Sequence, residues 1–146
     1  MLTEMHVPFR REVTVKFEGG PRKYARVDFI WPTQYGATIF EVDEFAHRSP
    51  RYDVAYECQR MKLVYQEMLT RGCERVHFIR YNSHPTRGKR KPTREERVDQ
   101  IGEALAHIPA APLVITYLFY HMKDGLPEIV LLPEYTLREH VRAQEL

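Results

Sequence analysis

The chain has 146 residues, of which 43% are hydrophobic and 29% are charged, a balance that excludes a disordered or collagen-like chain and is typical of one folded domain. Its 22 basic and 20 acidic side chains give a formal charge of +2, so the overall charge does not by itself indicate a polyanion partner. The N-terminus lacks the apolar core of a signal peptide, no run approaches the length of a membrane span, and Cys58 and Cys73 lack the CxxC spacing of a zinc ribbon. We therefore expect residues 1–146 to form a single soluble, intracellular domain with no membrane contact.

Three consecutive strands are predicted for the first third of the chain. Apolar residues alternate with polar ones over residues 13–17 and again over residues 27–31, and the Gly-Gly-Pro turn between them indicates a hairpin. The turn "TQYG" then leads to "ATIFEVDEF", residues 37–45, a third strand rich in β-forming residues that ends in acids.

A helix, a strand and a second helix should follow. Apolar side chains recur at three- and four-residue spacing over residues 52–71, and Gly72 stands where a helix C-cap belongs. The segment "RVHFIRYN" has strand character, and Thr93 with Glu96 forms a capping-box pattern that opens the next helix.

The last third of the chain predicts two further strands and a terminal helix. "PLVITYLFYHM", residues 112–122, is apolar on both alternations, and "EIVLLP", residues 128–133, would pair with it through the turn "KDG". The tail from Glu134 onward has the spacing of a short amphipathic helix. The order β-β-β-α-β-α-β-β-α predicts a single α/β domain with a mixed central sheet flanked by helices.

Three acids fall within these predicted strands. Asp28 lies in the second strand, while Glu41 and Asp43 lie two apart in the third and therefore on one face. If the strands are neighbours, the three carboxylates converge, and a hard cation such as Mg²⁺ would relieve their repulsion. In the alternative, Asp28 pairs with Arg26 or another basic residue and the remaining acids mark a solvated strand end.

At these residues the chain resembles the PD-(D/E)xK restriction-endonuclease-like nucleases. The shared pattern is an Asp in one strand, a short turn, two acids two apart at the end of the next strand, then a helix and a strand. The resemblance implies a restriction-endonuclease-like core in which Asp28 and Glu41 bind Mg²⁺ or Mn²⁺. Val27 stands in place of the family's Pro, and Asp43 stands where the family carries a Lys. The strings "EVDEFAHRSPRYDVAYECQRM" and "VHFIRYN" resemble a compact nuclease-like subgroup, over roughly residues 24–82.

Four further residues are candidates for the chemistry, each with a simpler alternative. His47 could orient or deprotonate water, or be an exposed loop residue. Glu57 could act as a metal ligand or base in place of the missing Lys, or simply pair with Arg60 one turn further on. Arg80 and Asn82 share one side of their strand and are candidate nucleic-acid-binding residues. Arg80 could contact a phosphate, or form a salt bridge instead.

A basic segment, "HPTRGKRKPTREER", lies between the predicted strand and the second helix. It is either a solvated connection or a phosphate-binding loop. Its candidate nucleic-acid-binding residues are Arg87, Lys89, Arg90, Lys91 and Arg94.

Together these features predict a divalent-metal-dependent endonuclease that hydrolyses phosphodiester bonds in DNA. Asp43 would help to hold the metal bound by Asp28 and Glu41, or a second one. RNA is not excluded as the substrate, and a homodimer is possible because cutting both strands needs two sites. The alternatives are an inactive nucleic-acid-binding module and a structural subunit with a nuclease-like fold.

Overall fold

The computed structural model describes residues 9–20, 22–43, 54–84, 91–120, 122–123, 126–127 and 141–144. Within these residues it contains β1 (Arg10–Lys16), β2 (Tyr24–Thr33), β3 (Gly36–Asp43), α1 (Val54–Thr70), β4 (Arg75–Asn82), α2 (Arg94–Ala106), β5 (Leu113–Leu118), β6 (Met122–Lys123), β7 (Leu126–Pro127) and β8 (Val141–Gln144). In this described part, neither helix has the length and apolar character that crossing a membrane requires.

The main sheet is mixed, with the strand order β1-β2-β3-β4-β5-β8. The first three strands pair antiparallel, and the pairs β3–β4, β4–β5 and β5–β8 are parallel. The parallel pairs β3–β4 and β4–β5 are each joined through a helix, as parallel neighbours require. Strands β6 and β7 form a separate two-stranded hairpin.

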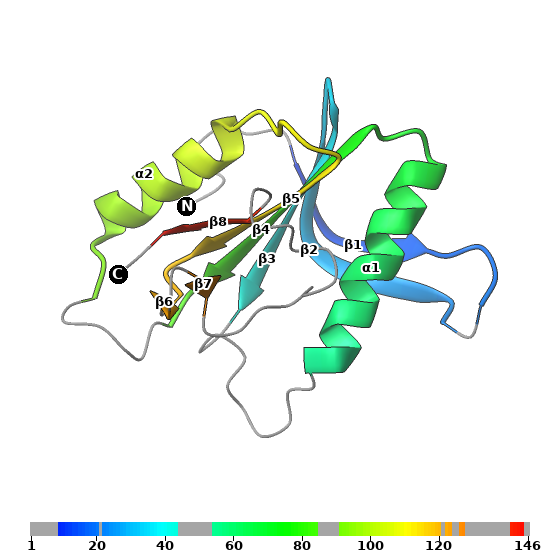
Figure 1. The fold of residues 1–146 in the computed structure, drawn as a ribbon, viewed down its shortest axis with the longest axis horizontal. Helices are drawn as coiled ribbons and strands as arrows, with labels where there is room; N and C mark the ends of the chain where they lie inside the picture. The colour runs from blue at the N-terminus through cyan, green and yellow to red at the C-terminus, as the bar shows by residue number, and fades with distance from the viewer. Residues whose placement is uncertain are drawn as a thin grey trace.

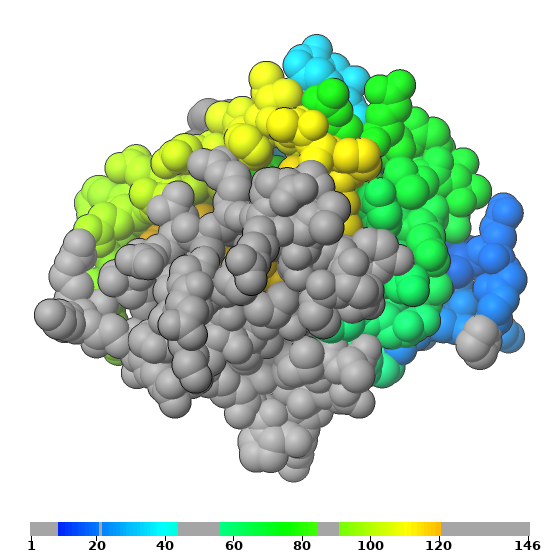
Figure 2. Space-filling view, viewed as in Figure 1, coloured from blue at the N-terminus to red at the C-terminus, as the bar shows by residue number. Residues whose placement is uncertain are grey.

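The two helices cover opposite faces of the sheet (Figure 1). The apolar stripe of α1 packs on side chains such as Ile39, Phe78 and Ile115, while α2 packs Ile101 on Phe40 and Ile79. Alternate residues of the central strands therefore enter different cores, which explains why β5 is buried at every position. The β1–β2 hairpin lies at the edge of the molecule beside α1 (Figure 2).

The β1–β2 ribbon turns over at one point. Val13 and Val27 face the α1 core, whereas Phe9 and Phe29 join the α2 core. Phe9 is four residues from Val13, and Phe29 is two residues from Val27. In a regular strand, residues at these even spacings would share one face. Between them, Glu12 has a positive φ of 47°, a conformation that costs a residue with a side chain roughly 1–3 kcal/mol. Asp28 lies between the paired residues Val27 and Phe29, at the point where β2 changes the face that it presents.

Most of the predicted helices and strands are confirmed, but the predicted C-terminal helix is not. Gly72 has a φ of 92° after α1, and Thr93 with Glu96 forms the complete capping box of α2. The predicted terminal helix is wrong at residues 141–144, which form β8, because the edge of β5 is available for parallel pairing there. The short strands β6 and β7 pair antiparallel, while the predicted turn at residues 124–125 and the predicted strand at residues 128–133 lie outside the described residues.

Candidate active site

Acidic and basic side chains gather on the α1 face of the sheet, at the carboxyl ends of the parallel strands. In β3, Ala37 and Ile39 face α1, so the alternation places Glu41 and Asp43 on the same side. In β4, Val76 and Phe78 likewise place Arg80 there. The carboxyl ends of parallel strands are the usual location of ligand sites in α/β sheets.

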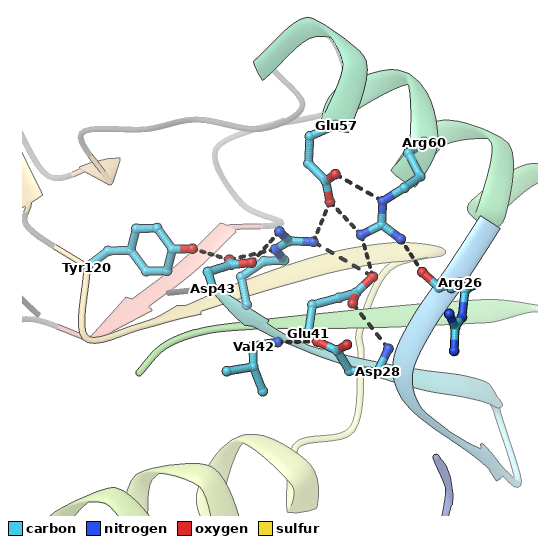
Figure 3. Close-up of polar contacts among 9 residues, drawn as sticks. Arg26, Asp28, Glu41, Val42, Asp43, Glu57, Arg60 and Tyr120 are labelled. Atoms are coloured by element: carbon cyan, nitrogen blue, oxygen red, sulfur yellow. Dashed lines mark hydrogen bonds and ion pairs between the residues drawn. The ribbon is translucent and has the colours of Figure 1, made fainter. Parts of the chain in front are cut away.

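Asp28 and Glu41 lie together where β2 and β3 separate. The strands pair from Thr33–Gly36 to Phe29–Phe40, and beyond that point β2 curves toward α1 while β3 continues away from it (Figure 1). Beyond that point, two backbone amides donate to side-chain carboxylates instead of to the backbone of the neighbouring strand. The amide of Asp28 donates to Oε2 of Glu41 at 3.3 Å, and the amide of Val42 donates to Oδ2 of Asp28 at 2.8 Å (Figure 3).

Arg60 of α1 reaches into this gap from above. Its Nη2 lies 2.6 Å from Oε1 of Glu41 and 2.5 Å from Oε1 of Glu57, and its Nε donates to Oε2 of Glu57 at 2.9 Å. Its Nη1 also donates to the carbonyl oxygen of Arg26 at 2.7 Å, which ties α1 to β2. The structure thus shows the pairing of Glu57 with Arg60 that was the simpler alternative for Glu57.

Arg80 is the buried centre of a second set of contacts. The residue is 0% exposed, its Nε and Nη2 contact the two carboxylate oxygens of Asp43 at 2.8 and 2.5 Å, and its Nη1 donates to Glu57 at 3.0 Å. Tyr120 donates from its hydroxyl to Oδ2 of Asp43. The network therefore connects β3, β4, α1 and the segment after β5 (Figure 3).

Tyr120 reaches Asp43 because the chain bends after β5. Tyr117 faces the α1 core and Leu118 the α2 core, so strict alternation would send residue 120 to the α2 side. Phe119 instead has a positive φ of 63°, and its side chain joins the α2 core while Tyr120 joins the α1 core. The side chain of Asn82 donates to the carbonyl oxygen of Phe119 at 3.0 Å and so supports this bend.

The electrostatics leave Glu41 with an affinity for added positive charge. Burial raises the pKa of Glu41, and Asp28 raises it further, against the lowering effects of Arg80 and Arg60. Glu57 behaves oppositely, because burial raises its pKa but the contacts with Arg60 and Arg80 outweigh burial and lower it. Burial also raises the pKa of Tyr120, as does Asp43, so its hydroxyl keeps the proton that it donates.

The donor set suits a small hard cation held by two carboxylates rather than three. Among the described residues, no group of three or more acidic, His or Cys side chains has the arrangement of a metal site. Mg²⁺ commonly takes only one or two carboxylates and keeps several waters. Both oxygens of Asp43 contact the fully buried Arg80, and one of them also accepts from Tyr120. The oxygens of Glu41 contact the partly exposed Arg60 and the amide of Asp28, so a cation could replace Arg60 there without breaking a fully buried ion pair. Asp28 and Glu41 are therefore the stronger candidate ligands, and the predicted contribution of Asp43 to a metal site stays a prediction.

The roles predicted for Arg80 and Asn82 also need correction. Both are buried, at 0% and 3% exposed, and both use their polar groups on other parts of the chain. Contact between a phosphate and Arg80 would require breaking a buried ion pair. The salt-bridge alternative thus describes Arg80, and Asn82 supports the backbone at Phe119.

The basic segment is only partly described. His47, Arg87, Lys89 and Arg90 lie outside the described residues, so their predicted roles stay predictions. Lys91 and Arg94 are exposed at the start of α2. Arg97 is half-buried and donates to the Tyr81 hydroxyl and the Ser83 carbonyl at 2.8 and 3.0 Å, which anchors α2 to the end of β4.

Sequence reasoning missed two members of the site. Arg60 was expected to contact only Glu57, since helical spacing cannot show that the guanidinium also reaches Glu41. Tyr120 lies in an apolar run, and the positive φ at Phe119 that redirects it has no glycine or asparagine to signal it. The ExxR spacing in α1 was the only available signal for Arg60.

Comparisons with known proteins leave the family of the chain open. No protein-family model matches it, and no curated protein matches it. A solved structure described as "Protein of Unknown Function AF1548" is similar at 12% sequence identity and a TM-score of 0.35. That likeness covers 80% of this chain and 52% of the other, so the chain spans about half the length of that protein.

Proposed function

We propose that the protein is a divalent-metal-dependent nuclease with a restriction-endonuclease-like core, acting on DNA. The observation that carries the proposal is the meeting of Asp28 and Glu41 in the gap between β2 and β3, with Arg60 already holding a positive charge against Glu41. The PD-(D/E)xK-like pattern assigned the metal to the same two residues. The location at the carboxyl ends of β3 and β4 also supports a catalytic site.

In the proposed mechanism Asp28 and Glu41 hold Mg²⁺ or Mn²⁺. Such a cation, when bound, neutralises phosphate oxygens and lowers the pKa of a coordinated water. Val42 orients Asp28 through its amide, and the amide of Asp28 orients Glu41, so each carboxylate is fixed by the backbone of the other strand. The buried contacts of Arg80 and Asp43 keep β3 and β4 in register beneath the site.

Glu57 and His47 divide the remaining roles. The lowered pKa of Glu57 makes it a weak proton acceptor, and its three contacts with Arg60 and Arg80 suit it to positioning these arginines. We therefore favour His47 over Glu57 as the group that accepts a proton from water, because an imidazole exchanges protons near neutral pH.

The test is cleavage of supercoiled plasmid by purified protein with Mg²⁺ or Mn²⁺, compared with the same protein in EDTA. Nicking that requires the metal supports the proposal. If the protein binds DNA without cutting it in either metal, the inactive-module alternative replaces the enzyme. If it binds neither metal nor DNA, the acids are structural.

Metal binding should release a proton from Glu41 when the pH is low. Because the folded pKa of Glu41 is raised, the carboxyl group contributes stability below its unfolded pKa, and this contribution is lost as the pH rises through the folded pKa. A cation replaces the proton, so we expect metal affinity to increase with pH across that range, by up to about tenfold per pH unit. Calorimetry in buffers of different ionisation enthalpy measures the proton count.

Glu57→Gln serves as the control for proton release, since the lowered pKa of Glu57 leaves it already ionised in this pH range. The number of protons released on metal binding should be the same in that variant as in the wild type. An affinity that does not change with pH would show that Glu41 does not exchange a proton for the metal.

Arg60 should compete with the metal for Glu41. Its guanidinium lies 2.6 Å from Oε1 of Glu41 and its side chain is 15% exposed, so it is an internal cation beside the proposed site. We expect Arg60→Gln to raise Mn²⁺ affinity about tenfold, because one nearby positive charge is removed. Arg71→Gln is the matched control, since Arg71 pairs with Glu67 at the other end of α1. Unchanged or weaker binding by Arg60→Gln would contradict this role.

A further inference from the structure

The β1–β2 hairpin carries a concentration of positive charge that the proposed active site does not use. Residues 10–26 contain six basic side chains and two acidic ones, in a chain whose overall charge is only +2. Arg10, Arg11, Lys16, Lys23 and Arg26 are exposed. The hairpin lies at the edge of the molecule, beside α1 (Figure 2).

Four of its residues form a surface on the side facing away from α1. Val13, Val15, Ala25 and Val27 point into the α1 core, so the alternating residues Thr14, Lys16, Tyr24 and Arg26 point outward. Lys16 lies directly opposite Tyr24, and Thr14 lies opposite Arg26, in the antiparallel register. We call these four residues the hairpin surface.

Tyr24 is the residue that gives this surface a specific chemistry. It is 57% exposed, so a large aromatic surface is in contact with water. Lys16 lies opposite it in β1, and Arg26 lies two residues further along β2. An aromatic ring between cations is the combination with which proteins hold single-stranded nucleic acid, because bases stack on the ring while the cations contact phosphates. In a duplex the bases are already stacked on one another, so they would not stack on the ring of Tyr24.

The hairpin surface lies next to the proposed active site along β2. Arg26 lies two residues before Asp28 in β2, and its carbonyl oxygen accepts a hydrogen bond from Arg60. At about 3.3 Å per residue, Tyr24 lies roughly 13 Å along the strand from Asp28.

We propose that the hairpin surface binds a single-stranded segment of the nucleic acid, on one side of the bond presented to Asp28 and Glu41. This inference rests on the proposed function and adds the substrate class, a strand with an unpaired segment next to the cut. Lys16 and Arg26 contact its phosphates, and Tyr24 stacks on a base.

The alternative explanation is that the charges only protect an exposed sheet edge. β1 is the edge strand of the main sheet, and edge strands often carry Lys or Arg that prevent pairing with other chains. That role needs charge and does not need the ring of Tyr24. Substitutions of the ring and of the charges therefore separate the two explanations.

The test measures binding of a labelled single strand and the matching duplex, in EDTA, across a range of salt concentrations. Tyr24→Ala should weaken single-strand binding by about 5- to 150-fold and leave duplex binding nearly unchanged, whereas Tyr24→Phe should bind as the wild type does. Lys16→Gln combined with Arg26→Gln should reduce the salt slope by about 1.4 on the single strand. Lys62→Gln on α1 is the control for losing one positive charge elsewhere.

The outcomes distinguish the hairpin surface from the proposed function. If the wild type binds and cuts nucleic acid but the hairpin variants bind like the wild type, the hairpin inference is overturned and the nuclease stands. Equal effects of Tyr24→Ala on single strand and duplex would also overturn it. If the wild type binds no nucleic acid, both proposals fail. Thermal melting of the variants should match the wild type, because these side chains point away from the core.

Discussion

Replacing Glu41 by Gln should remove nearly all cleavage while preserving the fold. The amide keeps the size of the side chain and can still accept the hydrogen bond from Asp28, but it loses the charge that holds a hard cation. Loss of the metal removes several kcal/mol of charge stabilisation, which corresponds to a rate reduction of about 10³-fold or more. Asp28→Asn should behave in the same way. Plasmid nicking under single-turnover conditions measures the effect.

The control for this prediction is Glu67→Gln, which removes a carboxylate from the same domain at an exposed i,i+4 pair with Arg71. It should cut at the wild-type rate. Glu57→Gln should slow cleavage less than Glu41→Gln and should still bind metal, because Glu57 acts through Arg60 and Arg80. A Glu41→Gln protein that cuts normally would remove Glu41 from the active site.

Replacing Asp43 by Asn should destabilise the protein rather than abolish metal binding. Arg80 is 0% exposed, and Asp43 supplies both oxygens that its Nε and Nη2 contact. Without Asp43, the buried guanidinium loses its two-oxygen partner but keeps the contact of Nη1 with Glu57, so we expect a cost near the lower end of the roughly 3–5 kcal/mol that removing one partner of a buried ion pair costs. Urea unfolding, compared with the wild type at the same pH, measures the loss.

Two variants show whether this loss comes from the ion pair. Tyr120→Phe removes one hydroxyl donor to Asp43 and should cost only about 1 kcal/mol. Asp43→Asn combined with Arg80→Met removes the stranded charge and should recover part of the stability. If Asp43→Asn is as stable as the wild type but loses Mn²⁺ binding, Asp43 is a ligand, as the sequence predicted.

The sequence predicted the elements whose signals are local. Alternation located β1 and β2, and runs of β-forming residues located β3 and β4. The i,i+3 and i,i+4 spacing located α1, and the Thr93–Glu96 capping box located the start of α2. The end of the chain failed because residues 141–144 pair with β5, and that contact depends on the whole sheet rather than on local spacing. Amphipathic spacing in a short segment fits a helix or an edge strand about equally well.

The part of the site that depends only on the positions of the strands was predictable from the sequence. Two neighbouring strands and a period of two were enough to bring Asp28 and Glu41 together and to place Glu41 and Asp43 on one face. The division of the acids between a candidate metal pair and a buried ion pair was not predictable. It depends on the separation of β2 from β3 and on the bend at Phe119, which arise from tertiary packing and from backbone conformations that the sequence does not signal.

Titration of the wild-type protein and of Glu41→Gln with Mn²⁺, followed by calorimetry or by the electron paramagnetic resonance signal of free Mn²⁺, tests the central claim most directly. The claim is that Asp28 and Glu41 form a cation site in the gap between β2 and β3. We predict saturable binding to the wild type that Glu41→Gln abolishes, with both proteins melting cooperatively. Equal binding by the two proteins, or no binding by the wild type, would contradict it.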